Sequence, residues 1–218
     1  CPTARAAPCP HAPTTFPRPG GRRGLRAGGS RMSVSGPQAP TMNAPLLAFL
    51  TWPQRWLLLA VLLALSALLL FGRIASLDEF IKARGEGGIM ALQFAGSAAR
   101  AAHLLVAWRG LEDLLRSQTR WDFLFLLVYP AVLSLACAML AEARGNPLPT
   151  IGIFVAWLAL AAIPLDAIEN LATLRMIDHG ASEPLARWIT VCATMKFAIV
   201  LTAAGYLLVA GIATLFQR

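Results

Sequence analysis

Charged residues are scarce in this chain of 218 residues. Only 14% of the residues are charged, 57% are apolar, and the mean hydropathy is +0.61. A soluble globular domain usually carries charge at about a quarter of its positions, so this composition argues against one. The chain is therefore expected to belong to the membrane class of proteins.

Acidic residues are absent from residues 1–45, which hold six arginines and are otherwise rich in Pro, Ala and Gly. The net charge of +8 thus divides into +6 here and +2 in the rest of the chain, where the other 13 basic residues stand against 11 acidic ones. Because the remainder is nearly neutral, the charge gives little support for a nucleic-acid partner.

The same segment also lacks any hydrophobic period. It cannot bury enough apolar surface to offset chain entropy, so residues 1–45 are predicted to be a disordered tail. Its arginines suit a transit-like leader. They equally suit GC-rich upstream DNA translated by read-through, with Met32 or Met42 as the native start. We favour the second interpretation, in which the tail is not natively translated.

Several patterns that mark enzyme, cofactor and metal sites are missing. The four cysteines show no C-x-x-C spacing, and the apolar runs contain no histidine cluster, so neither a disulfide framework nor a zinc site is indicated. No G-x-S-x-G or phosphate-binding loop occurs. Asp166 and Glu169 form a D-x-x-E pair, which alone is a weak magnesium signal. We therefore assign no catalytic, cofactor-binding or metal-binding residue.

Long apolar runs fill most of residues 46–218, which we predict to be one membrane domain. The fold predicted is all-α, a polytopic transmembrane bundle. Trp52 and Trp56 stand where an aromatic belt would lie at the start of the first run, and Pro164 should kink or loosen the third. The predicted spans cover about 52–74, 121–141, 150–174 and 187–216.

The segment between the first two spans has a different pattern. Apolar residues recur every three or four positions over 89–120, while polar residues such as Gln93, Arg100 and His103 occupy the other side. This is typical of an amphipathic helix that lies on the membrane surface or caps the bundle. Gly110 is the expected point of any break, and we interpret His103 as a solvated side chain.

The third span carries a polar stripe. Asp166, Glu169, Asn170 and Thr173 follow one another at i, i+3, i+4 and i+7, which places them on one helix face. Alternation of the spans, at 1.5 Å per helical residue, brings this stripe to the depth of polar residues on the second and fourth spans. The predicted intramembrane polar cluster comprises Asp122, Tyr129, Asp166, Glu169, Asn170 and Lys196.

Two short motifs carry a resemblance to a known group. The chain has D-x-x-F-x-x-x-Y from Asp122 to Tyr129, D-x-x-E-N from Asp166 to Asn170, and a lysine in the final span. In these features it resembles an uncharacterised group of small bacterial four-span membrane proteins. The resemblance covers roughly residues 50–215 and implies the architecture, without an assigned activity.

Ionised side chains are costly inside a membrane, so the cluster should face inward and pair. Our leading interpretation is a structural or accessory protein of the bacterial inner membrane, whose ion pairs and hydrogen bonds fix the register of the helices. The alternative is a small proton- or ion-coupled transporter, and the third is an intramembrane lipid-modifying enzyme. The expected partners are the lipid bilayer and either a second copy of the chain or another membrane protein. A contact between Lys196 and the cluster's acids that excludes water favours the first interpretation. A water-filled cavity that reaches Asp166 and Glu169 favours the other two.

Overall fold

The computed structural model describes residues 49–143 and 146–216, and within them the chain is all-α without strands. The tail predicted over 1–45 lies outside the described residues. The helices are α1 (Trp52–Leu69), the π-helical segment η1 (Leu70–Ile74), α2 (Ala75–Lys82), α3 (Ile89–Gln93), α4 (Ala98–Ala107), α5 (Glu112–Ala141), α6 (Pro149–Leu160), α7 (Ala162–His179) and α8 (Glu183–Phe216).

Four helical stretches in the described part are long and apolar enough to cross a membrane, as a multi-pass membrane protein requires. They are Trp52–Lys82, Glu112–Ala141, Pro149–His179 and Glu183–Phe216, with 30 to 34 residues each. At 1.5 Å per residue each is about 45 Å long, which exceeds a hydrocarbon core of about 30 Å. Each helix can therefore cross the core and reach well into the polar headgroup region.

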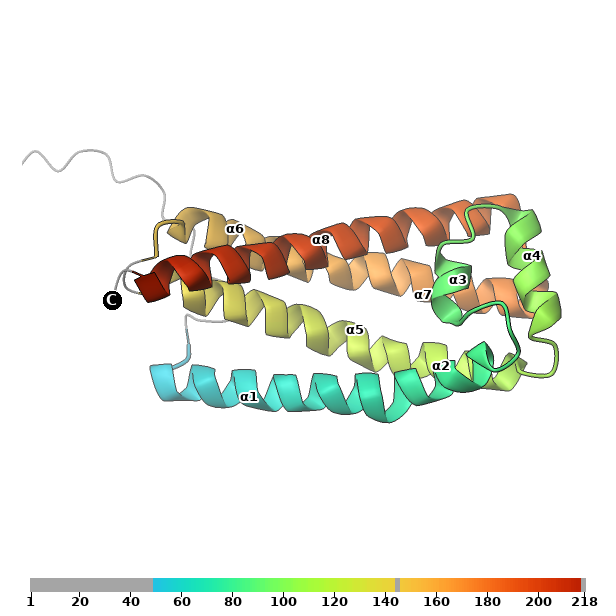
Figure 1. Ribbon diagram of the computed structural model, residues 1–218, viewed down its shortest axis with the longest axis horizontal. Helices are drawn as coiled ribbons and strands as arrows, with labels where there is room; N and C mark the ends of the chain where they lie inside the picture. The colour runs from blue at the N-terminus through green and yellow to red at the C-terminus, as the bar shows by residue number, and fades with distance from the viewer. Residues whose placement is uncertain (1–48, 144–145, 217–218) are drawn as a thin grey trace, which may run out of the picture. The chain divides into compact units, whose positions relative to one another are not determined.

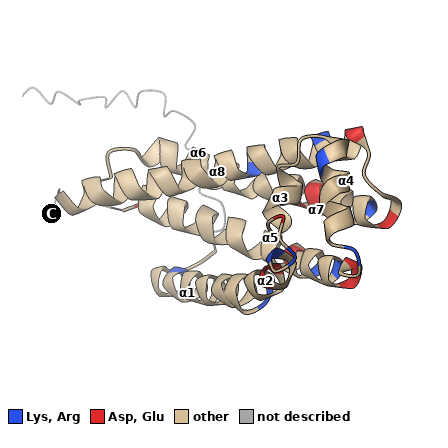
Figure 2. Cartoon of the chain, turned by 45° about the vertical axis from the view of Figure 1, so that its right-hand side comes forward, with Lys and Arg blue, Asp and Glu red and all other residues tan. Residues whose placement is uncertain are grey.

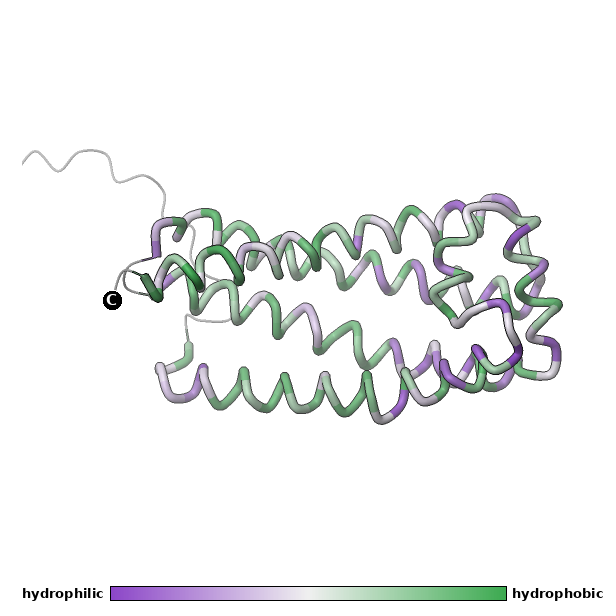
Figure 3. Tube along the Cα trace, viewed as in Figure 1, coloured by the Kyte–Doolittle hydropathy of each residue, from purple (hydrophilic) through white to green (hydrophobic). Residues whose placement is uncertain are grey.

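The short helices α3 and α4 lie at one end of the long helices, beside α2 and the ends of α7 and α8 that meet there (Figure 1). Lys, Arg, Asp and Glu gather at this end (Figure 2), and the chain is mostly hydrophobic along the rest of its length (Figure 3). We call it the capped end. The start of α1 and the end of α8 lie together at the opposite end.

The first helix packs differently from the others. α1 runs beside α5 (Figure 1), and Leu69 is its only buried residue. By contrast, α5, α7 and α8 pack against one another and supply most of the apolar core. The inner side of the first span is thus left partly open toward α8.

The amphipathic helix predicted over 89–120 is not a single helix. It is interrupted at Gly96 and Gly110, which have φ values of 70° and 82° that a continuous helix does not allow. Ser97 caps α4 by accepting a hydrogen bond from the Arg100 N–H at 3.3 Å. Residues 112–120 belong to α5, so the second long helix begins nine residues before the predicted start at 121.

The third long helix is interrupted close to Pro164, where the sequence predicts a kink. The helix is interrupted at Ala161, between α6 and α7. Pro164 has no N–H to offer the Leu160 carbonyl four residues earlier, and its ring crowds that carbonyl. The interruption therefore falls one turn before the proline, while α7 continues through it.

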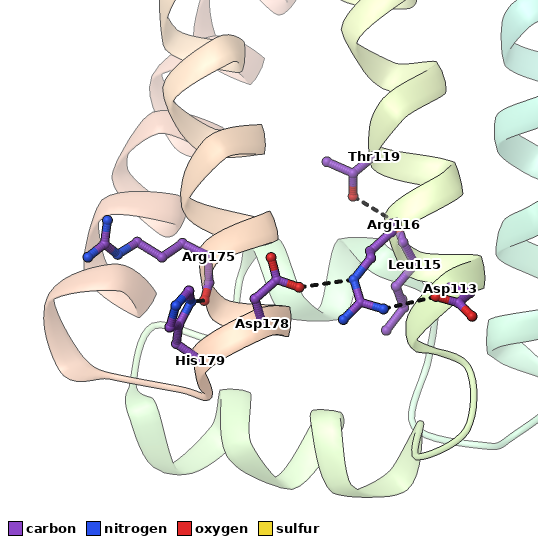
Figure 4. Close-up of polar contacts among 7 residues, drawn as sticks. All are labelled: Asp113, Leu115, Arg116, Thr119, Arg175, Asp178 and His179. Carbon is purple, nitrogen blue, oxygen red and sulfur yellow. Dashed lines mark hydrogen bonds and ion pairs between the residues drawn. The ribbon is translucent and has the colours of Figure 1, made fainter.

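Ion pairs and caps hold the capped end together. Arg116 of α5 donates from Nε to Asp178 of α7 and from Nη1 to Asp113, both at 2.9 Å (Figure 4). Asp78 of α2 accepts the Ile89 N–H at 2.7 Å and thereby ties the start of α3 to the first span. A side chain at Gly88 would overlap the Asp78 carboxylate, so this close approach requires glycine.

Candidate functional site

The centre of the site is Lys196 of α8. Its Nζ lies 2.7 Å from Asp166 Oδ1 and 2.8 Å from Glu169 Oε2, and both carboxylates belong to α7. The lysine side chain is 8% exposed, and the two acids are 2% and 0% exposed. We call these three residues the ion centre. Its contacts are direct, and it joins the last two long helices.

Tyr129 adds the second long helix to this centre. Its hydroxyl donates to Asp166 Oδ2 at 3.0 Å. Asp166 therefore accepts a hydrogen bond from α5 on one carboxylate oxygen and from Lys196 of α8 on the other. The Tyr129 ring stacks against Phe125, with centroids 4.9 Å apart. The polar contacts therefore connect α5, α7 and α8 at one level.

Asp122 differs from the other acids of the cluster. It lies beside Asn170, and no lysine or arginine of the described residues forms an ion pair with it. Asn170 is 3% exposed, and its Nδ2 has no hydrogen-bond partner in the described part of the chain. The structure thus brings all six predicted cluster residues into one region, and it joins Tyr129, Asp166, Glu169 and Lys196 by contacts of 3.0 Å or less.

A cavity of about 550 Å³ borders the cluster. Five of the six predicted residues line it, and Glu169 lies behind the wall. Polar groups from α2, α3, α5 and α7 join them toward the capped end, while Ser66 of α1 and apolar residues of η1, α5 and α8 line the other part. The added polar residues are Ser66, Asp78, Lys82, Gln93, Gln118, Thr119 and Thr173. Apolar lining comes from Leu70, Ile74, Val132, Leu133 and Val200.

Two buried glutamines leave acceptors unused in this wall. Gln93 is 7% exposed and Gln118 is 2% exposed. Neither Gln93 Oε1 nor Gln118 Oε1 has a hydrogen-bond partner among the described residues. An orphaned buried acceptor costs about 1–3 kcal/mol, so such groups usually meet a water or a ligand. A cavity of this size provides room for either.

Sequence reasoning missed these glutamines. Gln118 stands one helical turn before Asp122 on α5, and this i, i+4 spacing was a signal that it shares the polar face. Gln93 gave no such signal, because its position depends on the chain turning back at Gly96. The interpretation of the 89–120 segment as one amphipathic helix hid both from the site.

Two other polar residues lie away from the site. The Arg175 side chain is exposed and points away from the Arg116–Asp178 contact (Figure 4), so it pairs with no acid of the cluster. The His103 side chain is 59% exposed and lies 3.5 Å from Glu86, which fits the interpretation of a solvated histidine.

Within the described residues, no group of three or more His, Cys, Asp or Glu side chains is arranged to hold a metal ion. Comparison of the chain with protein-family models, with curated proteins and with solved structures gives no match. The resemblance to small bacterial four-span proteins therefore stays a prediction.

Proposed function

We propose that this protein is a small carrier of the bacterial inner membrane that binds an amphipathic small molecule in the cavity beside the ion centre. The observation that carries the proposal is the cavity itself. It joins buried polar groups without partners to an apolar wall, at the level where α5, α7 and α8 meet. Ligand sites commonly combine an apolar lining with a few convergent polar groups, and this volume is typical of them.

The arrangement supports entry from the side. α1 is buried only at Leu69, and the cavity is lined by Leu70 and Ile74 on one side and by Phe197 and Val200 of α8 on the other. An amphipathic molecule dissolved in the bilayer can pass between these helices without crossing the polar capped end. The π-helical turn at 70–74 widens the helix at this place, and such turns are frequent at functional sites.

A structural or accessory role is the second candidate, and the direct contacts of Lys196 favour it. A lysine held at 2.7 and 2.8 Å by two buried carboxylates fixes the register of α7 against α8. The two roles involve different residues. Asp166 and Lys196 of the ion centre line one wall. Asp122, Gln93 and Gln118 line another part of the cavity, and the unpaired Oε1 atoms of the two glutamines lie just beneath its surface, where a side-chain rotation brings them to a ligand.

Ligand binding can be tested with the full chain in phosphatidylcholine nanodiscs. Equilibrium dialysis of radiolabelled octanol and octylamine, with empty nanodiscs subtracted, should show saturable binding of at least one probe. Val200→Phe adds volume to the apolar part of the cavity and should abolish that binding. The exposed position Leu201 lies outside the lining, so Leu201→Phe should leave it unchanged. Absence of saturable binding of both probes would refute the carrier proposal.

A further inference from the structure

We propose that the cavity selects a lipophilic amine in its protonated form, with the ammonium group held at Asp122 and the hydrocarbon part against η1 and α8. This inference rests on the proposed function, because it names the class of ligand for the same cavity. It follows from three observations: how the charges are paired, which polar atoms are unused, and what surrounds them.

The pairing of charges leaves Asp122 as the acid of the cavity wall that contacts no cation. Asp78 is satisfied by Lys82 Nζ at 2.7 Å and by the Ile89 N–H at 2.7 Å. Lys196 is shared between Asp166 and Glu169, so the ion centre already holds one acid more than it has bases. Both lysines of the cavity wall are therefore engaged, and Asp122 is left without a cationic partner.

This arrangement disfavours an anionic ligand. An anion in the cavity would lie against the carboxylates of Asp78, Asp122 and Asp166, and like charges repel strongly where water is scarce. A cation at Asp122 instead supplies the missing positive charge. Burying a charge costs little only when it is paired and hydrogen-bonded, and a cationic ligand satisfies this condition for Asp122.

The unused atoms further indicate a ligand that donates hydrogen bonds. Gln93 Oε1 and Gln118 Oε1 are both acceptors, and the Asp122 carboxylate adds two more acceptor oxygens. An ammonium group carries three N–H donors, which matches these three side chains. The Asn170 amide lies beside Asp122, and its Nδ2 has no hydrogen-bond partner among the described residues.

The aromatic and apolar residues that line the cavity suit a cation and a hydrocarbon chain. The stacked rings of Phe125 and Tyr129 border the cavity beside Asp122 and offer aromatic faces to a cation. Farther from the capped end, Leu70, Val132 and Val200 provide apolar contact for a hydrocarbon chain. The polar and apolar ends of the cavity thus match the two ends of an alkylammonium ion.

The test compares two probes of equal chain length, octylamine and octanol, by the same dialysis on the full chain in nanodiscs. Octylamine is protonated near neutral pH, as the lysine side chain is. A charge-assisted hydrogen bond contributes about 1.5–3 kcal/mol, so octylamine should bind about tenfold or more tightly than octanol. Asp122→Asn should remove most of this preference. Glu79→Gln, which neutralises an exposed acid outside the cavity, should preserve it.

A second variant keeps the test decisive should Asp122→Asn fold poorly. Gln118→Met removes one acceptor at similar volume and should weaken octylamine binding about threefold to tenfold while sparing octanol. Equal binding of the two probes to the native chain would overturn the inference and leave the carrier proposal intact. A preference for octylamine that persists in both Asp122→Asn and Gln118→Met would also overturn it. Failure of both probes to bind would refute the carrier proposal itself.

Discussion

Replacing Lys196 with methionine should be among the most damaging single changes in this protein. The substitution keeps an unbranched side chain of similar length but removes the only cation in contact with Asp166 and Glu169, among the residues described. Two acids that are 2% and 0% exposed then lie together without a counter-charge. Removing one partner of a buried pair is strongly destabilising because the other charge stays buried.

The magnitude follows from this burial. Breaking a buried ion pair from one side costs about 3–5 kcal/mol. For a chain of this size that loss lowers the midpoint of thermal unfolding by about 6 to 20 °C. Asp166→Asn or Glu169→Gln should each cost less, because Lys196 keeps its other carboxylate in either variant.

The triple change Lys196→Met, Asp166→Asn and Glu169→Gln removes every charge of the ion centre and should recover much of the lost stability. Thermal unfolding in detergent, followed by fluorescence-detected size exclusion, measures each variant. Lys82→Met is the matched control: this lysine is 57% exposed, so its ion pair with Asp78 is solvent-screened and the shift should be much smaller. Strictly additive losses in the triple variant would refute the idea that the three charges act as a unit.

Two further predictions concern the end opposite the capped end. Gly152→Ala should lower the midpoint of thermal unfolding by about 2 to 12 °C, measured in the same detergent assay. A Cβ at this position overlaps the Tyr206 hydroxyl, which accepts a hydrogen bond from Asn146 at 2.8 Å. An unchanged midpoint would show that the Tyr206 side chain moves aside without cost. Alkaline phosphatase fused at Asn146 or at the C-terminus should be active, because the basic residues gathered at the capped end (Figure 2) should hold that end in the cytoplasm. Inactive fusions at both places would establish the opposite orientation, which the arginines of the tail would favour.

The ion centre was accessible to sequence reasoning because helix geometry fixes both face and depth. Asp166 and Glu169 share a face at i and i+3, and counting 1.5 Å per residue brings Lys196 and Tyr129 to their level. The expense of lone charges in a membrane then requires pairing, whatever the details of packing. These arguments need only the positions of residues along straight helices, and in the structure these side chains contact one another.

The cavity was not accessible in this way. Its polar wall needs α3 to turn back at Gly96 and to be tied to α2 through Asp78, and periodicity over 89–120 contains no information about that turn. The backbone there is set by tertiary contacts, such as the Thr190 hydroxyl that donates to the Gln93 carbonyl at 2.9 Å. The unused acceptor on Gln93 is a consequence of the turn, so it was hidden as well.

The polar cluster divides into residues that contact one another and an acid that lines the cavity without a cation. Lys196, Asp166, Glu169 and Tyr129 contact one another across three helices, so the chain's own side chains join these helices at that level. Asp122 stands on the same helix as Tyr129, two turns nearer the capped end, and lines the cavity without a cation. Because the ion pairs of the ion centre do not involve Asp122, a ligand at Asp122 would leave them intact. Stability and ligand selectivity should therefore separate in mutants: changes at Lys196 should alter unfolding first, and changes at Asp122 should alter the preference for an amine first.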